Sequence, residues 1–83
     1  MKERLMPRYY LNFRQGQTLH RDPEGADFSD LEQAHREAVC CAKELVAAAV
    51  VDNEPVSGHM EVEDADGRIL ATIRLRDMII IES

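Results

Sequence analysis

The chain has few aromatic residues and almost no cysteine. Its 83 residues include no tryptophan, two tyrosines, two phenylalanines and two cysteines. Cys40 and Cys41 are adjacent, and adjacent residues on a helix point about 100° apart, so we expect no disulfide framework. No apolar run approaches the ~20 residues that a membrane-spanning helix needs, and the N-terminal stretch MKERLMPRYY lacks the apolar core of a signal peptide. We therefore expect a cytoplasmic protein that does not bind a membrane.

Basic residues are outnumbered by acidic ones. Ten Lys and Arg stand against 16 Asp and Glu, which gives a net charge of −6. This charge opposes nonspecific binding to nucleic acid, which needs a basic surface, and docking on anionic membranes. The chain is long enough for one domain with a thin margin of stability. We expect a flexible N-terminal extension over residues 1–5 and a single α+β domain over residues 6–83.

Three segments have the period-2 alternation that is typical of half-buried strands. Segment 8–14 places Tyr9, Leu11 and Phe13 on one face. Gly16 predicts a turn into a short returning strand over residues 17–21. Residues 59–64 and 69–75 alternate as well and are joined by the Asp66-Gly67 turn. The inward residues of the last segment are Ile69, Ala71, Ile73 and Leu75.

One long helix is predicted between these pairs of strands. Ser29 to Glu32 fits a capping box, and the helix should run from about Asp30 to about Asp52, before Pro55. Its expected core face holds Leu31, Ala38, Ala42, Leu45 and Ala49, with Ala34 at the edge. The order β-β-α-β-β predicts a two-layer α+β fold, with one helix on one face of a mostly antiparallel four-stranded sheet. The tail MIIIE either extends the last strand or forms a fifth.

The helix also carries His35, Cys40 and Cys41, but their spacings do not bring them together on one metal ion. Cys40 lies too far from the helix N-terminus for an activated thiol. We expect Cys41 to be a buried small hydrophobic residue and Cys40 to be mostly exposed. We find no glycine loop for phosphates and no nucleophile with a base. We expect no catalytic residues, no cofactor and no metal site.

Two surfaces are candidates for interaction. The open face of the sheet would show Tyr10, Asn12, Arg14, Arg74 and Arg76, which form one patch if the first and last strands are neighbours. Aromatic residues with arginine on a sheet are one way to stack single-stranded bases, although Glu61 and Glu63 face the same way. The second candidate is the C-terminal half of the helix, which is apolar on all sides and so should be covered. Its expected dimer surface is Ala47, Val50, Val51 and Ile80.

The segments MPRYYLNFRQG, DPEGADFSDLEQAHREA and DADGRILATIRLRDMIIIE resemble a family of small bacterial, often rhizobial, proteins known as domain of unknown function 6894. This resemblance covers residues 6–82 and implies a fold but no site residues. The helix DLEQAHREAVCCAKEL more weakly resembles that of HicB-like antitoxins. We therefore expect a non-enzymatic protein-interaction or regulatory module that binds itself as a homodimer or binds another protein. The alternative is an antitoxin-like or nucleic-acid-binding module that uses the open sheet face.

Overall fold

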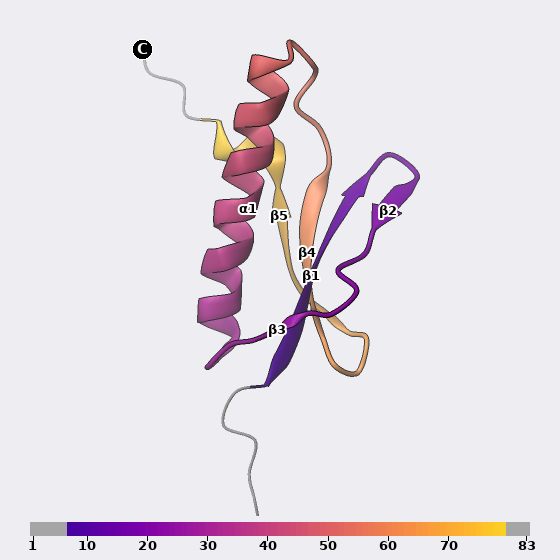
Figure 1. The fold of residues 1–83 in the computed structure, drawn as a ribbon, viewed down its shortest axis with the longest axis vertical. Coiled ribbons are helices and arrows are strands. Elements are labelled where there is room, and N and C mark those ends of the chain that lie inside the picture. The colour runs from indigo at the N-terminus through magenta and orange to yellow at the C-terminus, as the bar shows by residue number, and fades with distance from the viewer. Residues whose placement is uncertain (1–6, 80–83) are drawn as a thin grey trace, which may run out of the picture.

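A computed structural model describes residues 7–79 of the chain (Figure 1). It has the expected α+β architecture, with one long helix on a mostly antiparallel sheet. In chain order the elements are β1 (Arg8–Gln15), β2 (Thr18–His20), β3 (Ala26–Asp27), α1 (Leu31–Val51), β4 (His59–Asp64), β5 (Ile69–Arg74) and the 3-10 helix η1 (Leu75–Met78). The expected extension over residues 1–5 and residues 80–82 of the MIIIE tail lie outside the described residues.

The strands lie in the order β2-β1-β4-β5, and all of the pairs are antiparallel. Strand β3, which the sequence patterns did not predict, pairs with the first residues of β1. It is only two residues long, so alternation cannot reveal it. Because β4 lies between β1 and β5, the first and last strands are not neighbours. The expected single patch of Tyr10, Arg14 and Arg74 required these two strands to be neighbours, so that patch does not form as expected.

The helix begins one residue later than the capping box predicted. Asp30 is the N-cap, and its Oδ1 accepts a hydrogen bond from Gln33 N at 2.9 Å. The Gln33 side chain accepts from Ser29 N at 3.0 Å, so Ser29 precedes the cap. An aspartate cap with a glutamine three residues later resembles the predicted Ser29–Glu32 box, but it satisfies the amides of Gln33 and Ser29 in place of Glu32 and Ser29.

Alanine makes the contact between the helix and the sheet. Ala34, Ala38 and Ala42 are fully buried, whereas Leu31 is 37% exposed and Leu45 is half-buried. Leu31, expected on the core face, is exposed because it lies in the first turn, at the end of the helix. Small alanines let the helix approach the sheet closely. The sheet supplies the larger core side chains, which are Tyr9, Met60, Val62 and Ile73, and Leu75 of η1 completes the core.

The last strand departs from its predicted alternation at both ends. A bulge makes Val62 pair with Ala71 but Glu63 with Ile69, so Ile69 shares a face with Glu63 and is 49% exposed instead of facing the core. At its other end the strand stops at Arg74, and η1 follows beside the upper half of α1 in Figure 1. The predictions of an inward Ile69 and of a strand through Leu75 were wrong, although Leu75 is buried as expected.

Candidate functional site

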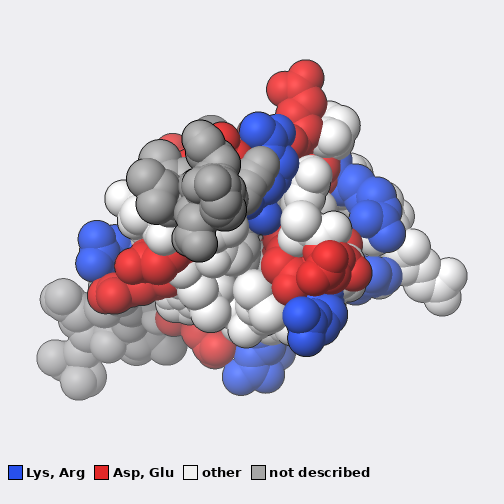
Figure 2. Space-filling view, turned by 90° about the horizontal axis from the view of Figure 1, so that it is seen from below, with Lys and Arg blue, Asp and Glu red and all other residues white. Residues whose placement is uncertain are grey.

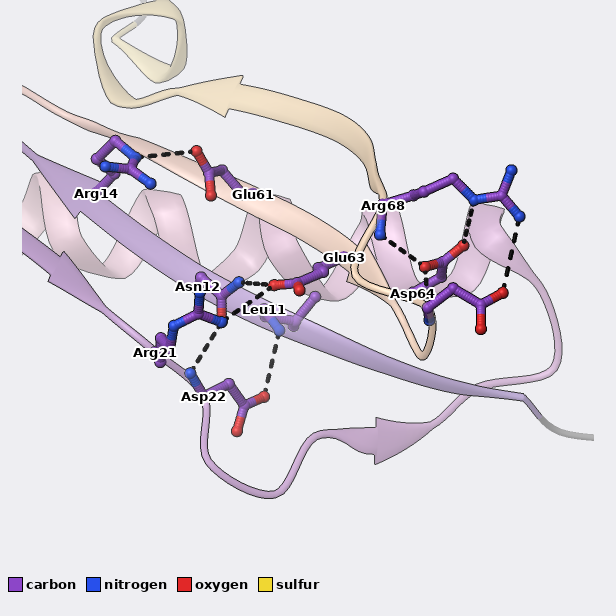
Figure 3. Close-up of polar contacts among 10 residues, drawn as sticks. Leu11, Asn12, Arg14, Arg21, Asp22, Glu61, Glu63, Asp64 and Arg68 are labelled. Carbon is purple, nitrogen blue, oxygen red and sulfur yellow. Dashed lines mark hydrogen bonds and ion pairs between the residues drawn. The ribbon is translucent and has the colours of Figure 1, made fainter.

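The face of the sheet that points away from α1 carries a row of ion pairs. Arg14 of β1 lies opposite Glu61 of β4, with Arg14 Nε 3.2 Å from Glu61 Oε2 (Figure 3). His59 Nε2 lies 3.0 Å from the same oxygen. Burial raises the pKa of Glu61, but the hydrogen bonds with His59 and Arg14 and the charge of Arg14 outweigh it, so the pKa is lowered. Glu61 is therefore a carboxylate that joins two strands.

Asn12 lies on this face but does not reach solvent, because it is only 1% exposed. Its side-chain oxygen accepts from Asp22 N at 2.9 Å, and its amide donates to Glu63 (Figure 3). Arg21 Nη1 lies 3.7 Å from the same carboxylate oxygen of Glu63. The segment after β2 thus folds over Asn12. The Asn12 side chain holds this segment in place and is not free to contact a partner.

The two C-terminal arginines of the expected surface occupy different elements. Arg74 ends β5, and its Nε lies 3.3 Å from Asp77 Oδ2. Arg76 lies in η1, beyond the strand, and is exposed. The expectation that Arg76 continues the sheet face was wrong, because the chain turns into a 3-10 helix after Arg74. Tyr10, at the opposite end of the sheet, is half-buried.

The charges of this face are therefore mixed. Each of Arg14, Arg21 and Arg74 lies within 3.7 Å of a carboxylate oxygen. At the lower end of the molecule, which Figure 2 shows, Lys and Arg likewise lie beside Asp and Glu. Such a surface offers few uncompensated cations to a phosphate backbone.

The C-terminal end of α1 is apolar, as its sequence predicts, but in the single chain it is exposed where cover was expected. Val50 is 66% exposed and Val51 is 81% exposed, and Ala47 one turn earlier is exposed as well. Ile79, after η1, is another large exposed apolar residue. Ile80, the fourth residue of the predicted dimer surface, lies outside the described residues.

A groove that the sequence patterns did not predict runs between α1 and the β1–β2 hairpin. It has a volume of about 680 Å³, and Leu11, Phe13, Cys41 and Leu45 are among its lining residues. The spacing of Leu11, Phe13 and Leu45 in the sequence assigns all three to the core. Such spacing does not show how much of the sheet one helix can cover. Cys40 is exposed, as predicted from the helical wheel, whereas Cys41, which was expected to be buried, is only half-buried because it lies on the wall of this groove.

Within residues 7–79 no group of three or more His, Cys, Asp or Glu side chains is arranged to hold a metal ion. None of the helices in that range is both long and apolar enough to cross a membrane. The described polar residues of the sheet face instead hold strands and loops together.

Comparison with known proteins gives one match. The model of a family described as Domain of unknown function (DUF6894) matches residues 8–76, which contain all the strands found within residues 7–79 and the whole of α1. No curated protein and no solved structure matches the chain.

Proposed function

The chain belongs to the DUF6894 family, and we propose that it is a small non-enzymatic protein-interaction module that self-associates through the C-terminal end of α1. The observation that carries the proposal is the exposure of Val50 and Val51 on a helix end that has apolar residues on all sides. Burying a valine fully stabilises an assembly by about 1.5–3 kcal/mol. Two copies that cover this end would bury four such side chains.

The neighbouring residues supply further area for such an interface. A stable protein–protein interface buries more than about 1,000 Å² in total, so we expect it to extend beyond Val50 and Val51. Met78 and Ile79 follow β5 at the same end of the molecule, and η1 packs against α1. An interface that includes Ala47, Val50, Val51 and Ile79 would extend across two elements. Ile80 is part of the proposed dimer surface on its sequence alone.

The second candidate function, an antitoxin-like or nucleic-acid-binding module, has weaker support. It needs the sheet face as a basic platform, but Arg14 and Arg74 are each paired with an acidic side chain. Asn12 is buried under the segment after β2. The apolar helix end gives the interaction module the stronger physical basis.

The test is the mass in solution, measured by light scattering on a sizing column. We expect a wild-type dimer and a Val51→Asp monomer, with unchanged circular dichroism, because a buried unpaired carboxylate is costly. Ile69→Asp is the matched control, since Ile69 is exposed at the opposite end of β5, and this variant should remain a dimer. A monomeric wild type would remove self-association from the proposal. If the Val51→Asp protein is still a dimer, the interface lies on another surface.

A further inference from the structure

One helix is too narrow to cover this sheet. Four strands about 4.8 Å apart span roughly 14 Å between the outer strand axes, whereas a helix with its side chains is about 10–12 Å wide. Here α1 packs mainly on β4, β5 and η1, and of the strands it contacts it touches β1 least. The helix-facing side of β1 is consequently left partly uncovered, and this uncovered strip is the groove.

The groove has an apolar floor. Leu11 and Phe13 of β1 and Met60 of β4 form the floor, and Cys41 and Leu45 of α1 form one wall. Met60 is buried, but the other four are only half-buried in the single chain. The His20 ring also lines the groove and stacks on Phe13, with the two ring centroids 5.8 Å apart. The volume of about 680 Å³ lies within the range of about 300–1,000 Å³ that is usual for ligand pockets.

The rim of the groove is acidic. Glu44 of α1 and Asp22, which follows β2, are both among its lining residues. The pKa of the Cys41 thiol is raised, first by burial and then by the charges of Glu37 and Glu44, with smaller contributions that include Asp22. The negative charges of Glu37 and Glu44 therefore act on the helix wall of the groove. Arg21 also lines the groove, but its guanidinium lies 3.7 Å from Glu63.

We propose that this groove binds a basic amphipathic helical segment of another protein, whose apolar side chains cover Leu11, Phe13 and Leu45. Lys or Arg residues of that segment would lie near Glu44 and Glu37. Complementarity with the charges of Glu44 and Glu37 selects a basic segment over an acidic one. The proposal adds a second surface to the interaction role proposed above and does not depend on self-association at the helix end.

The test is a titration of the full-length, ¹⁵N-labelled chain with two synthetic peptides, followed by the amide chemical shifts. Both peptides carry leucine at helical spacing, and their charged positions are all Lys in one and all Glu in the other. We expect the Lys peptide to shift the amides of Leu11, Phe13, Cys41 and Leu45, and the Glu peptide to shift none of them. The same result is expected for Val51→Asp, so that failure of self-association and failure of the groove are separate outcomes.

Two charge-reversal variants test the role of the rim. Glu44→Lys should weaken binding of the Lys peptide about two- to fivefold, which is typical of an exposed ion pair. Glu54→Lys makes the same change in net charge beyond the helix end and should leave the affinity as in the wild type. Equal weakening in both variants would show nonspecific attraction and overturn the proposal. Shifts outside the groove, or the absence of shifts with the Lys peptide, would overturn it as well.

Thiol labelling tests occupancy of the groove independently. In Cys40→Ser the single remaining thiol is Cys41, on the groove wall. Saturating Lys peptide should slow labelling of Cys41 at least about tenfold, because the bound segment covers it. If labelling instead slows as protein concentration rises without peptide, a second copy occupies the groove and the proposed occupant is wrong.

Discussion

The carboxylate of Asp22 accepts the backbone hydrogen bond of Leu11 that a neighbouring strand would otherwise accept. Leu11 N donates to Asp22 Oδ2 at 3.2 Å, and Gly25 N donates to Asp22 Oδ1 at 3.1 Å. Strands β2 and β3 pair with the two ends of β1 and leave its middle without a ladder partner on that edge. One side chain thus satisfies an edge amide and closes the turn between two short strands.

Removal of this carboxylate should destabilise the fold. Asp22→Ala leaves the Leu11 amide without its acceptor at a half-buried position, and we expect a loss of about 1–3 kcal/mol in the free energy of unfolding. Asp22→Asn keeps one acceptor oxygen and should lose less. Glu24→Ala removes an exposed acid from the same turn and should stay within about 0.5 kcal/mol of the wild type. Urea denaturation measures all three, and an Asp22→Ala protein as stable as the wild type would refute this role.

The secondary structure could be predicted from the sequence because each strand carries its own alternation. Tyr9, Leu11 and Phe13 occupy the helix-facing side, as their spacing indicates, and Ala38 and Ala42 of the predicted helix face are fully buried. Strand order could not be predicted, because pairing of β1 with β4 joins residues about 50 positions apart and leaves no local pattern. The sheet-face patch depended on that order.

The burial of Asn12 and the groove could not be predicted for a related reason. Asn12 has the polarity and position of an exposed residue on an open face, and only the path of the chain after His20 buries it. Leu11 and Leu45 have the pattern of core residues, but the width of one helix leaves them half-buried. Both results follow from how distant segments are placed. The apolar composition of the helix end, in contrast, is a property of consecutive residues and could be read from the sequence, while its cover by a second copy stays a prediction.

Substitution of Gly58 by alanine should destabilise the protein more than substitution of Gly16. Both have positive φ, 95° at Gly58 and 60° at Gly16. A Cβ at Gly58 would lie 2.7 Å from the carbonyl oxygen of Arg14, whereas at Gly16 it would meet nothing within 4 Å. Gly16→Ala should cost about 1 kcal/mol for its backbone conformation, and Gly58→Ala should cost more. Thermal and urea unfolding check the order, and equal losses would contradict the steric explanation.

The two adjacent cysteines should differ in reactivity. Burial, followed by the charges of Glu37 and Glu44, raises the pKa of the Cys41 thiol, and the thiolate is the reactive form. Cys40 is exposed. We expect the protein with Cys41→Ser to react with a disulfide reagent several-fold faster at neutral pH than the protein with Cys40→Ser. The rate of reagent release measures this, and comparable rates would show that the groove does not shield Cys41.

The ion pairs of Glu61 should make stability depend on pH on the acid side. Because the pKa of Glu61 is lower in the folded protein than its ordinary value of 4.5, folding favours the charged carboxylate. The resulting stabilisation is fully present above the ordinary pKa and is lost as the pH falls through the pKa of the folded state. Glu61→Gln should therefore be less stable than the wild type by about 1–2 kcal/mol at neutral pH.

This difference should shrink as the pH falls below about 4.5, because a protonated Glu61 resembles glutamine. Urea midpoints at a series of pH values measure it. Glu32→Gln is the matched control, since Glu32 also pairs with an arginine, at 3.1 Å, but is exposed on α1. A surface pair of this kind contributes about 0–1 kcal/mol, so its pH dependence should be weaker. If the stability gap of Glu61→Gln stays constant from neutral to acidic pH, its cause is the altered shape or packing of the side chain and not the carboxylate charge.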